Sequence, residues 1–167
     1  MNEKATYNVA LCYEYNQVAL MVERETTEVG KRMIREDGTS QFESIVFDEQ
    51  YEDLRSRYFL RAGGAIRGMF SAYSRGDEGE SYDDYDVDTE DLAINLELPI
   101  TFPKGNLKAI DAQVYDYMVS YMCQEWFMAK DPNLSEAYRV KCNEARAEIK
   151  HLLNMRTRPH VRPYKLI

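Results

Sequence analysis

The sequence predicts a mainly α fold, in which a helical bundle with a long C-terminal helical hairpin carries a small β element at about residues 92–102. Two observations lead to this fold class. Apolar residues recur every three or four positions through most of the chain, which is typical of amphipathic helices. Strict alternation of apolar residues, which is typical of a strand, is clear only in residues 92–102. At 167 residues and 44% hydrophobic composition, the chain fits one domain, which we place at residues 1–155.

The first 47 residues are the least regular part of the pattern. Residues 7–13 fit either a strand or the approach to a helix, and both alternatives remain open. Residues 14–35 keep an approximate helical period, but the Thr26-Thr27 pair and Gly30 lower helix propensity, so we expect a frayed or broken helix. The apolar segment 42–47 then predicts an anchor that holds the preceding turn against the core.

A long helix is predicted after Asp48, whose side chain is suited to cap its first turn. Gly63, Gly64 and Gly68 lie within it and lower its helix propensity, which indicates close packing over small residues, with a hinge as the alternative. They lack the Lys-Ser/Thr ending of a phosphate-binding loop. The apolar positions spaced by threes and fours along this helix are Tyr51, Leu54, Tyr58, Ala62, Ala65, Met69 and Tyr73.

The strand predicted at residues 92–102 has one buried face. Pro99 has no N–H to donate, so we expect the strand at an edge of its sheet. Its partner must come from the region of Tyr7, from segment 42–47, or from another subunit, because an open strand edge is a template for pairing between chains. The residues expected on the buried face are Leu92, Ile94, Leu96, Leu98, Ile100 and Phe102.

The helical hairpin occupies residues 106–155, with a break at Asp131-Pro132-Asn133. Most of the first helix is apolar or aromatic, so it should be buried from several sides. The second helix has one apolar face, which indicates a peripheral position. Asp131 or Asn133 can cap it, and Glu136 is placed to reach back toward the cap. The residues that form the apolar face of the second helix are Tyr138, Cys142, Ala145, Ile149 and Leu152.

Charge is distributed asymmetrically in this chain of net charge -8. Residues 76–91 hold nine acidic residues and no basic one, which predicts a solvated loop, with an interaction surface for a basic partner as the alternative. Residues 156–167 are basic and contain two prolines, which predict an extended segment. Two alternatives remain open for it: a disordered chain end, or an arm that docks on an acidic surface such as the acidic loop of the next copy. The candidate interaction residues are Asp83, Asp84, Asp86, Asp88, Arg156, Arg158, Arg162, Tyr164 and Lys165.

The sequence contains no recognisable catalytic or metal-binding motif. Its two histidines, His151 and His160, and its three cysteines are scattered singly, and each cysteine lies on a predicted apolar face. The alternating carboxylates of the acidic loop lack the glycine that an EF-hand requires. We therefore expect no enzyme, no cofactor and no metal. The acidic net charge argues against a general nucleic-acid footprint, and the absence of a long apolar run predicts a protein made and kept in the cytoplasm, or in a particle assembled there.

The hairpin resembles the closing part of tailed-phage head-to-tail connector proteins, also called adaptor or neck proteins. The segments that carry the resemblance are Ala109-Ile110-Asp111-Ala112, Ala129-Lys130-Asp131-Pro132, Ala137-Tyr138 and the charged helix ending near Leu153. The resemblance covers about fifty residues, and the first half of the chain does not share it. It implies a small helical virion protein that forms a ring, twelvefold in that family, between the portal and the tail.

Two other function classes remain open at this stage. One is a monomeric or dimeric protein-binding module of a mobile element, whose acidic loop engages a basic partner. The other is an enzyme whose site has no recognisable motif. Assembly that weakens with salt would favour a connector held by its exposed charges, because salt screens such contacts.

Overall fold

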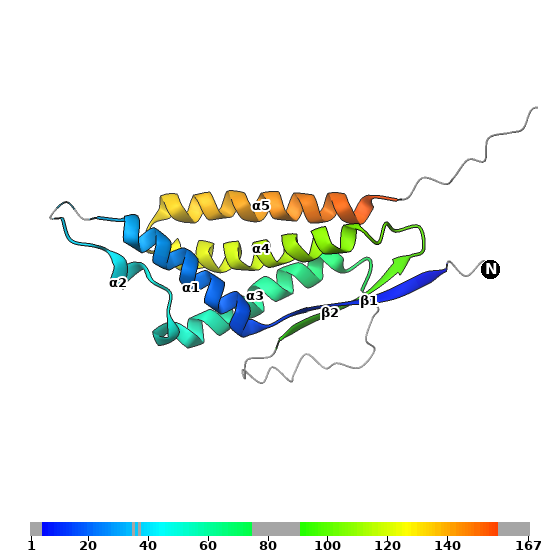
Figure 1. The fold of residues 1–167 in the computed structure, drawn as a ribbon, viewed down its shortest axis with the longest axis horizontal. Helices are drawn as coiled ribbons and strands as arrows, with labels where there is room; N and C mark the ends of the chain where they lie inside the picture. Colours follow the sequence, from blue (N-terminus) through cyan, green and yellow to red (C-terminus); the bar gives the residue numbers. More distant parts are fainter. Residues whose placement is uncertain (1–4, 35, 37, 75–90, 157–167) are drawn as a thin grey trace, which may run out of the picture.

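The structure is a computed structural model in which residues 5–34, 36, 38–74 and 91–156 are described. Long helices build most of the molecule, and a two-stranded sheet lies along one side of them (Figure 1). This arrangement confirms the predicted mainly α fold with a small β element. The long helices are α1 (Tyr15–Arg32), α3 (Glu52–Phe70), α4 (Asn106–Phe127) and α5 (Pro132–Asn154). The short helices are α2 (Phe42–Ile45) and the 3₁₀ helix η1 (Glu49–Tyr51), and the strands are β1 (Thr6–Tyr13) and β2 (Leu92–Pro99).

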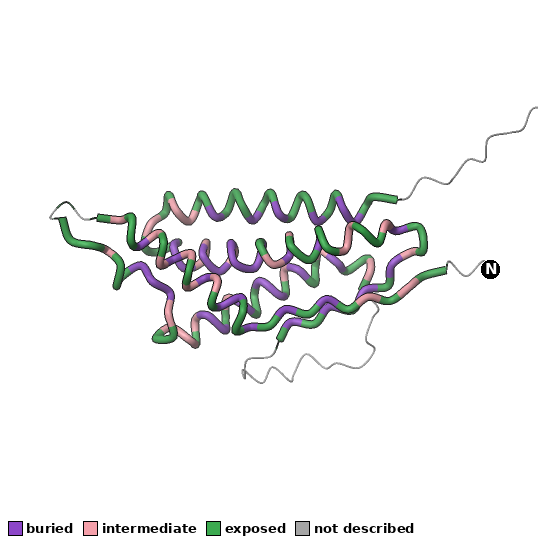
Figure 2. Tube along the Cα trace, in the orientation of Figure 1, coloured by how far each residue is buried: buried purple, intermediate pink, exposed green. Residues whose placement is uncertain are grey.

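Helix α4 is the centre of the bundle. It packs against α1, α3 and α5, which explains why apolar residues occur around most of its circumference. Helix α5 is buried along one face and exposed along the other, as the alternating colours in Figure 2 show. All five residues predicted for the apolar face of α5 are buried, so both predictions for the hairpin are confirmed.

The connection between α4 and α5 is stabilised by a helix cap. The side chain of Asp131 accepts hydrogen bonds from the backbone N–H groups of Asn133, at 2.9 Å, and Leu134, at 3.1 Å. Glu136 does not reach back to the cap, so that prediction is wrong. It is exposed and instead accepts a 2.6 Å hydrogen bond from Nε of Arg139, its neighbour one turn along the helix.

Helix α1 is continuous, and the prediction that it is broken is wrong. Thr26 is fully buried, and its hydroxyl donates to the carbonyl oxygen of Val22 at 3.0 Å, one turn back. The same hydroxyl oxygen accepts from the backbone N–H of Phe47 at 3.0 Å. Gly30 lies so close to α2 that an added Cβ would be 3.2 Å from the Cα of Phe42. Tertiary contacts therefore stabilise the two positions that weaken the helix locally.

Segment 42–47 is held against the core, as predicted. The ring of Phe47 stacks on Trp126 of α4 with 4.1 Å between ring centroids. The indole N–H of Trp126 donates to the carbonyl oxygen of Ile45 at 2.7 Å. Lys130 donates to the carbonyl oxygen of Ser44 at 2.6 Å and lies over the Trp126 ring. This segment is thus fixed to the end of α4 by both backbone and aromatic contacts.

The long helix predicted after Asp48 is two elements, because Asp48 caps η1 and α3 begins only at Glu52. The predicted apolar stripe is only partly buried, apart from Ala62, which is fully buried. The residues that are buried form a neighbouring stripe of α3, on the side where β2 packs. That contact is close at Gly63, where an added Cβ would be 3.1 Å from Leu92. Gly64 and Gly68 face open space, so close packing explains only Gly63. The buried apolar residues of α3 are Phe59, Ala62, Ile66 and Phe70.

Strands β1 and β2 pair antiparallel, from Thr6 opposite Pro99 to Tyr13 opposite Leu92. Of the three partners considered for β2, the Tyr7 region is therefore the one used. The strand predicted to reach residue 102 ends at Pro99, where a turn follows with a 2.8 Å hydrogen bond from the N–H of Phe102 to the Pro99 carbonyl. This turn exposes 70% of Ile100, which was predicted to be buried, while the other five residues of that face are buried.

Candidate functional site

Arg156 is the only predicted interaction residue within the described part of the chain. Of the acidic loop, only Asp91 is described, and its carboxylate accepts a 3.0 Å hydrogen bond from the N–H of Tyr15 at the start of α1. The predicted pairing of the acidic loop with the basic arm thus involves residues outside the described ranges. These residues are Asp83, Asp84, Asp86, Asp88, Arg158, Arg162, Tyr164 and Lys165.

The guanidinium group of Arg156 holds the end of α5 against Tyr73, which follows α3. It donates to the carbonyl oxygen of Leu153 at 2.6 Å and to the Tyr73 hydroxyl at 3.0 Å. The Tyr73 hydroxyl in turn donates to the Leu153 carbonyl at 3.2 Å. The structure therefore brings together the point where the basic arm begins and the residues that precede the acidic loop.

The outer edge of β2 is occupied beside this junction. The carbonyl oxygen of Tyr73 accepts a 2.7 Å hydrogen bond from the N–H of Glu97 in β2. Ser74 forms an isolated antiparallel bridge with Leu96. These contacts also show which residues of β2 bond to β1, because the N–H of Glu97 must point away from β1.

No described residue pairs with the outer edge of β1, the edge that faces away from β2. The backbone N–H of Glu97 points away from β1, so its partner Asn8 directs its own N–H and C=O away from β2. The same holds at every second residue of β1, that is at Thr6, Ala10 and Cys12. Within the described ranges, no residue outside the sheet forms a backbone hydrogen bond with these four positions. All four side chains are exposed. Strand β1 therefore presents a row of backbone donors and acceptors to a further strand.

Sequence reasoning left this edge unassigned. The alternation of Tyr7, Val9, Leu11 and Tyr13 with smaller or polar residues was a usable signal for a strand. That signal cannot reveal which side of the strand is paired. The pairing depends on β2, which follows β1 by more than 75 residues in the chain.

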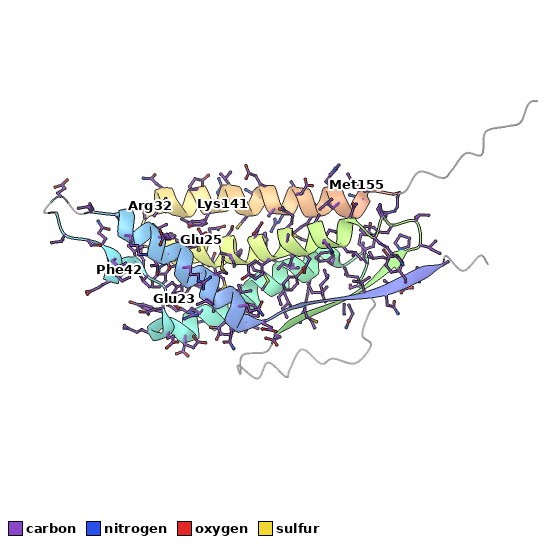
Figure 3. The ribbon with its side chains drawn as sticks, in the orientation of Figure 1. Glu23, Glu25, Arg32, Phe42, Lys141 and Met155 are labelled. Carbon is purple, nitrogen blue, oxygen red and sulfur yellow. The ribbon has the colours of Figure 1, made fainter. Side chains whose placement is uncertain are left out.

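A second surface feature is a groove of about 300 Å³ between α1, α4 and α5. Glu25 of α1 and Lys141 of α5, both labelled in Figure 3, contribute to its lining. The hydroxyl of Tyr138, also in the lining, donates to the Glu25 carboxylate at 3.1 Å. Burial raises the pKa of this hydroxyl well above its usual value, and the neighbouring Cys123 and Glu25 add to the shift. Tyr138 is therefore a neutral hydrogen-bond donor at physiological pH.

Two of the three cysteines are buried as predicted, whereas Cys12 is exposed on β1. Cys12 lies on the solvent side of the strand because side chains alternate between the two faces of a sheet. Burial raises the pKa of Cys142 to about 11 and raises that of Cys123 further. Since the thiolate is the reactive form, Cys123 and Cys142 are poor nucleophiles in the folded protein.

His151 is exposed in the last turn of α5, and His160 lies outside the described residues. In the described part of the chain, no three His, Cys, Asp or Glu side chains form a group that could hold a metal ion. No described helix is both long enough and apolar enough to cross a membrane.

The fold and its surfaces define a class of protein: a helical bundle with an attached two-stranded sheet, one edge of which no described residue occupies. Comparison of the chain with family models, with curated proteins and with solved structures finds no match.

Proposed function

We propose that this protein is a non-enzymatic structural component of a phage or prophage virion. In this role it is a head-to-tail connector, or neck protein, that assembles as a ring on the portal. The observation that carries the proposal is the α4–α5 hairpin, whose sequence resembles the closing part of such connectors and whose two helices pack closely in a continuous core.

The open edge of β1 supports repeated assembly of the chain. An edge on one side of a subunit, used by a different segment of the next subunit, is a heterologous contact, and such contacts generate closed rings when the rotation between subunits closes. The arm starts at Arg156 and is basic, so it is one candidate for that segment. In this function the partners are further copies of the chain, with the portal and tail or neck proteins above and below. The ring belongs to the virion neck and is assembled in the bacterial cytoplasm, with no membrane, cofactor or specific nucleic-acid site.

The test is the native mass of the purified protein, measured by light scattering across a concentration series and followed by negative-stain imaging. We expect closed rings, with twelve copies of the 19.6 kDa chain as the value that the connector resemblance implies. A chain that stays monomeric or dimeric at all concentrations, and does not join portal rings from a phage of the same source, would contradict the proposal. That result would favour the protein-binding module instead.

Removing residues 156–167 tests the role of the arm in this assembly. We expect the truncated chain to lose association while its helical circular dichroism stays unchanged, because the last helix, α5, ends at Asn154. The matched control replaces residues 157–167 with a Gly/Ser segment of equal length, which keeps Arg156 and its contacts with Tyr73. The control should lose association too, and a control that still assembles would show that the sequence of the arm is not required.

A further inference from the structure

The open edge of β1 accepts a strand. We propose that residues 159–166 of a second copy of this chain pair antiparallel with Thr6–Tyr13 and form the third strand of the sheet. This inference rests on the proposed function, because it names the contact between neighbouring copies.

The geometry of β1 sets what the incoming segment must provide. Outward N–H and C=O groups occur at every second residue, at Thr6, Asn8, Ala10 and Cys12. The partner must therefore offer N–H groups at every second residue along one edge. A proline is tolerated only where its missing N–H would face away from β1.

The arm meets this requirement in its sequence. Pro159 and Pro163 are four residues apart, so in an extended chain both missing N–H groups fall on the same edge. The opposite edge carries the intact N–H groups of the alternate residues. The arm can therefore pair through one edge only, and it ends the sheet rather than recruiting a fourth strand. The residues whose N–H groups face β1 in this arrangement are His160, Arg162, Tyr164 and Leu166.

One antiparallel register matches the arm to β1 over their full length. It places Leu166 opposite Thr6 and His160 opposite Cys12, so that eight residues pair with the eight of the strand. Side chains of paired residues share a face of the sheet, so Val161 lies beside the buried Leu11.

Charge complementarity favours the same register. The residue that precedes Pro159 is Arg158, and in this register it lies opposite the exposed Glu14, which follows β1. Neither strand of the sheet contains Lys or Arg, and β2 contributes Glu97. The basic arm therefore meets no like charge within the two strands.

The antiparallel strand must come from a second copy. Asn106 donates to the carbonyl oxygen of Leu152 at 3.4 Å, and the neighbouring Lys104 lies over the ring of Tyr7, so the end of α5 is next to the Tyr7 end of β1. Figure 3 labels Met155 at this end of the bundle. The register requires Pro159 beside Tyr13, which lies about 20 Å further along the strand.

The arm of the same chain is too short for that distance. Three residue steps from Arg156 to Pro159 span at most about 11 Å. An arm that binds its own β1 must start at the Tyr7 end and run parallel to the strand. With both prolines still facing away from β1, this parallel arm would place Leu166 beside the buried Leu11 and Arg162 beside Tyr7, and it would carry Arg158 away from Glu14. The parallel arrangement therefore loses the Arg158–Glu14 pair and brings the charged Arg162 to the core side of the sheet.

A disulfide between copies tests the register directly. Opposite residues in a hydrogen-bonded antiparallel pair have Cα atoms about 5.5 Å apart, which is within the range of disulfides. In the variant His160→Cys, the new thiol faces the native, exposed Cys12 of the neighbouring copy. Oxidised glutathione takes up the two electrons and two protons released when the bond forms. We expect covalent dimers and higher multimers on a non-reducing gel, with the buried Cys123 and Cys142 unmodified.

Matched variants separate this register from its alternatives. The double variant Cys12→Ser/His160→Cys should give no multimers. Val161→Cys, whose side chain faces the other side of the sheet, should cross-link to Cys12 about tenfold more slowly. Ile167→Cys would face Cys12 only if an arm ran parallel to β1.

Multimers formed by His160→Cys and lost in the double variant support the proposal. A cross-link within one chain, an equal rate for Val161→Cys, efficient cross-linking of Ile167→Cys, or no cross-link would overturn it. The mass of the wild-type protein, measured beside these variants, distinguishes the two proposals. Rings without the Cys12 cross-link would contradict only the docking of the arm, whereas a strict monomer would contradict the ring as well.

Discussion

Thr26 shows how a residue that weakens a helix locally can be required by the tertiary structure. A β-branched hydroxyl residue is unfavourable within a helix, because its side chain loses rotamer freedom and competes for backbone hydrogen bonds. Here the hydroxyl is fully buried and accepts the hydrogen bond of the Phe47 N–H. Without it, that N–H would be buried and unpaired. Thr26 therefore couples α1 to the segment that precedes α3.

Replacing Thr26 with valine should destabilise the protein by about 1–3 kcal/mol. Valine keeps the shape of threonine but leaves the Phe47 N–H without a partner. The measurement is the free energy of unfolding from urea titration followed by circular dichroism. Thr27→Val, one residue away and partly exposed, is the matched control and should change stability by no more than about 0.5 kcal/mol. Equal effects of the two substitutions would show that the Thr26–Phe47 hydrogen bond does not matter.

At the scale of elements, helix α3 packs against β2 through one of its three glycines. An added Cβ at Gly63 would be 3.1 Å from the Cδ1 of Leu92, whereas one at Gly64 would meet nothing within 4 Å. The two positions are adjacent in the same helix and share the same backbone conformation. They therefore separate the effect of packing from the effect of helix propensity.

We expect Gly64→Ala to stabilise the protein by about 0.4–1 kcal/mol, because alanine restricts the unfolded chain and favours the helix. Gly63→Ala should gain less or destabilise, since the Leu92 side chain must move to admit the new methyl group. Thermal unfolding of both variants measures the difference. A Gly63→Ala variant as stable as Gly64→Ala would mean that the contact with Leu92 relaxes without cost.

The elements that the sequence predicted best are those whose own apolar residues form a regular helical pattern. The hairpin was predicted from 106 to 155 and comprises α4 and α5, because each helix buries a continuous apolar face. The errors arise where distant residues decide the outcome. Helix α1 is unbroken because of Phe47 and Phe42, and the buried stripe of α3 is displaced because β2 packs at Gly63.

The candidate site was less predictable than the fold for a related reason. Sequence composition identified the charged segments 76–91 and 156–167, and most of both lies outside the described residues. Which edge of β1 is unpaired depends on its pairing with β2, a segment distant in the sequence. It also depends on the hydrogen bond from Glu97 of β2 to the Tyr73 carbonyl, which occupies the other edge of the sheet. Alternation could indicate that β1 is a strand, but only the assembled sheet shows which of its edges is unpaired.

At the scale of the whole molecule, the two ways in which the arm could join copies differ in physical character. A contact between the basic arm and an acidic loop would depend on exposed charges. A strand added to β1 would depend on backbone hydrogen bonds and on apolar contacts such as Val161 with Leu11. Salt separates them, because the Debye length falls from about 10 Å at 0.1 M to about 3 Å at 1 M.

We expect assembly to persist at high salt. If the arm adds a strand as proposed, high salt would weaken only an Arg158–Glu14 pair, and a surface pair is worth at most about 1 kcal/mol. The concentration needed for assembly should therefore rise less than about tenfold between 0.1 and 1 M NaCl. Analytical ultracentrifugation across that range measures the shift. Glu14→Gln should remove most of the remaining salt dependence, and Glu136→Gln, exposed on α5, is the matched control that should not. A rise of a hundredfold or more in the concentration needed for assembly would instead indicate that the arm binds the acidic loop of residues 76–91. That loop holds nine carboxylates, and salt weakens a contact between many exposed charges far more than it weakens a single pair.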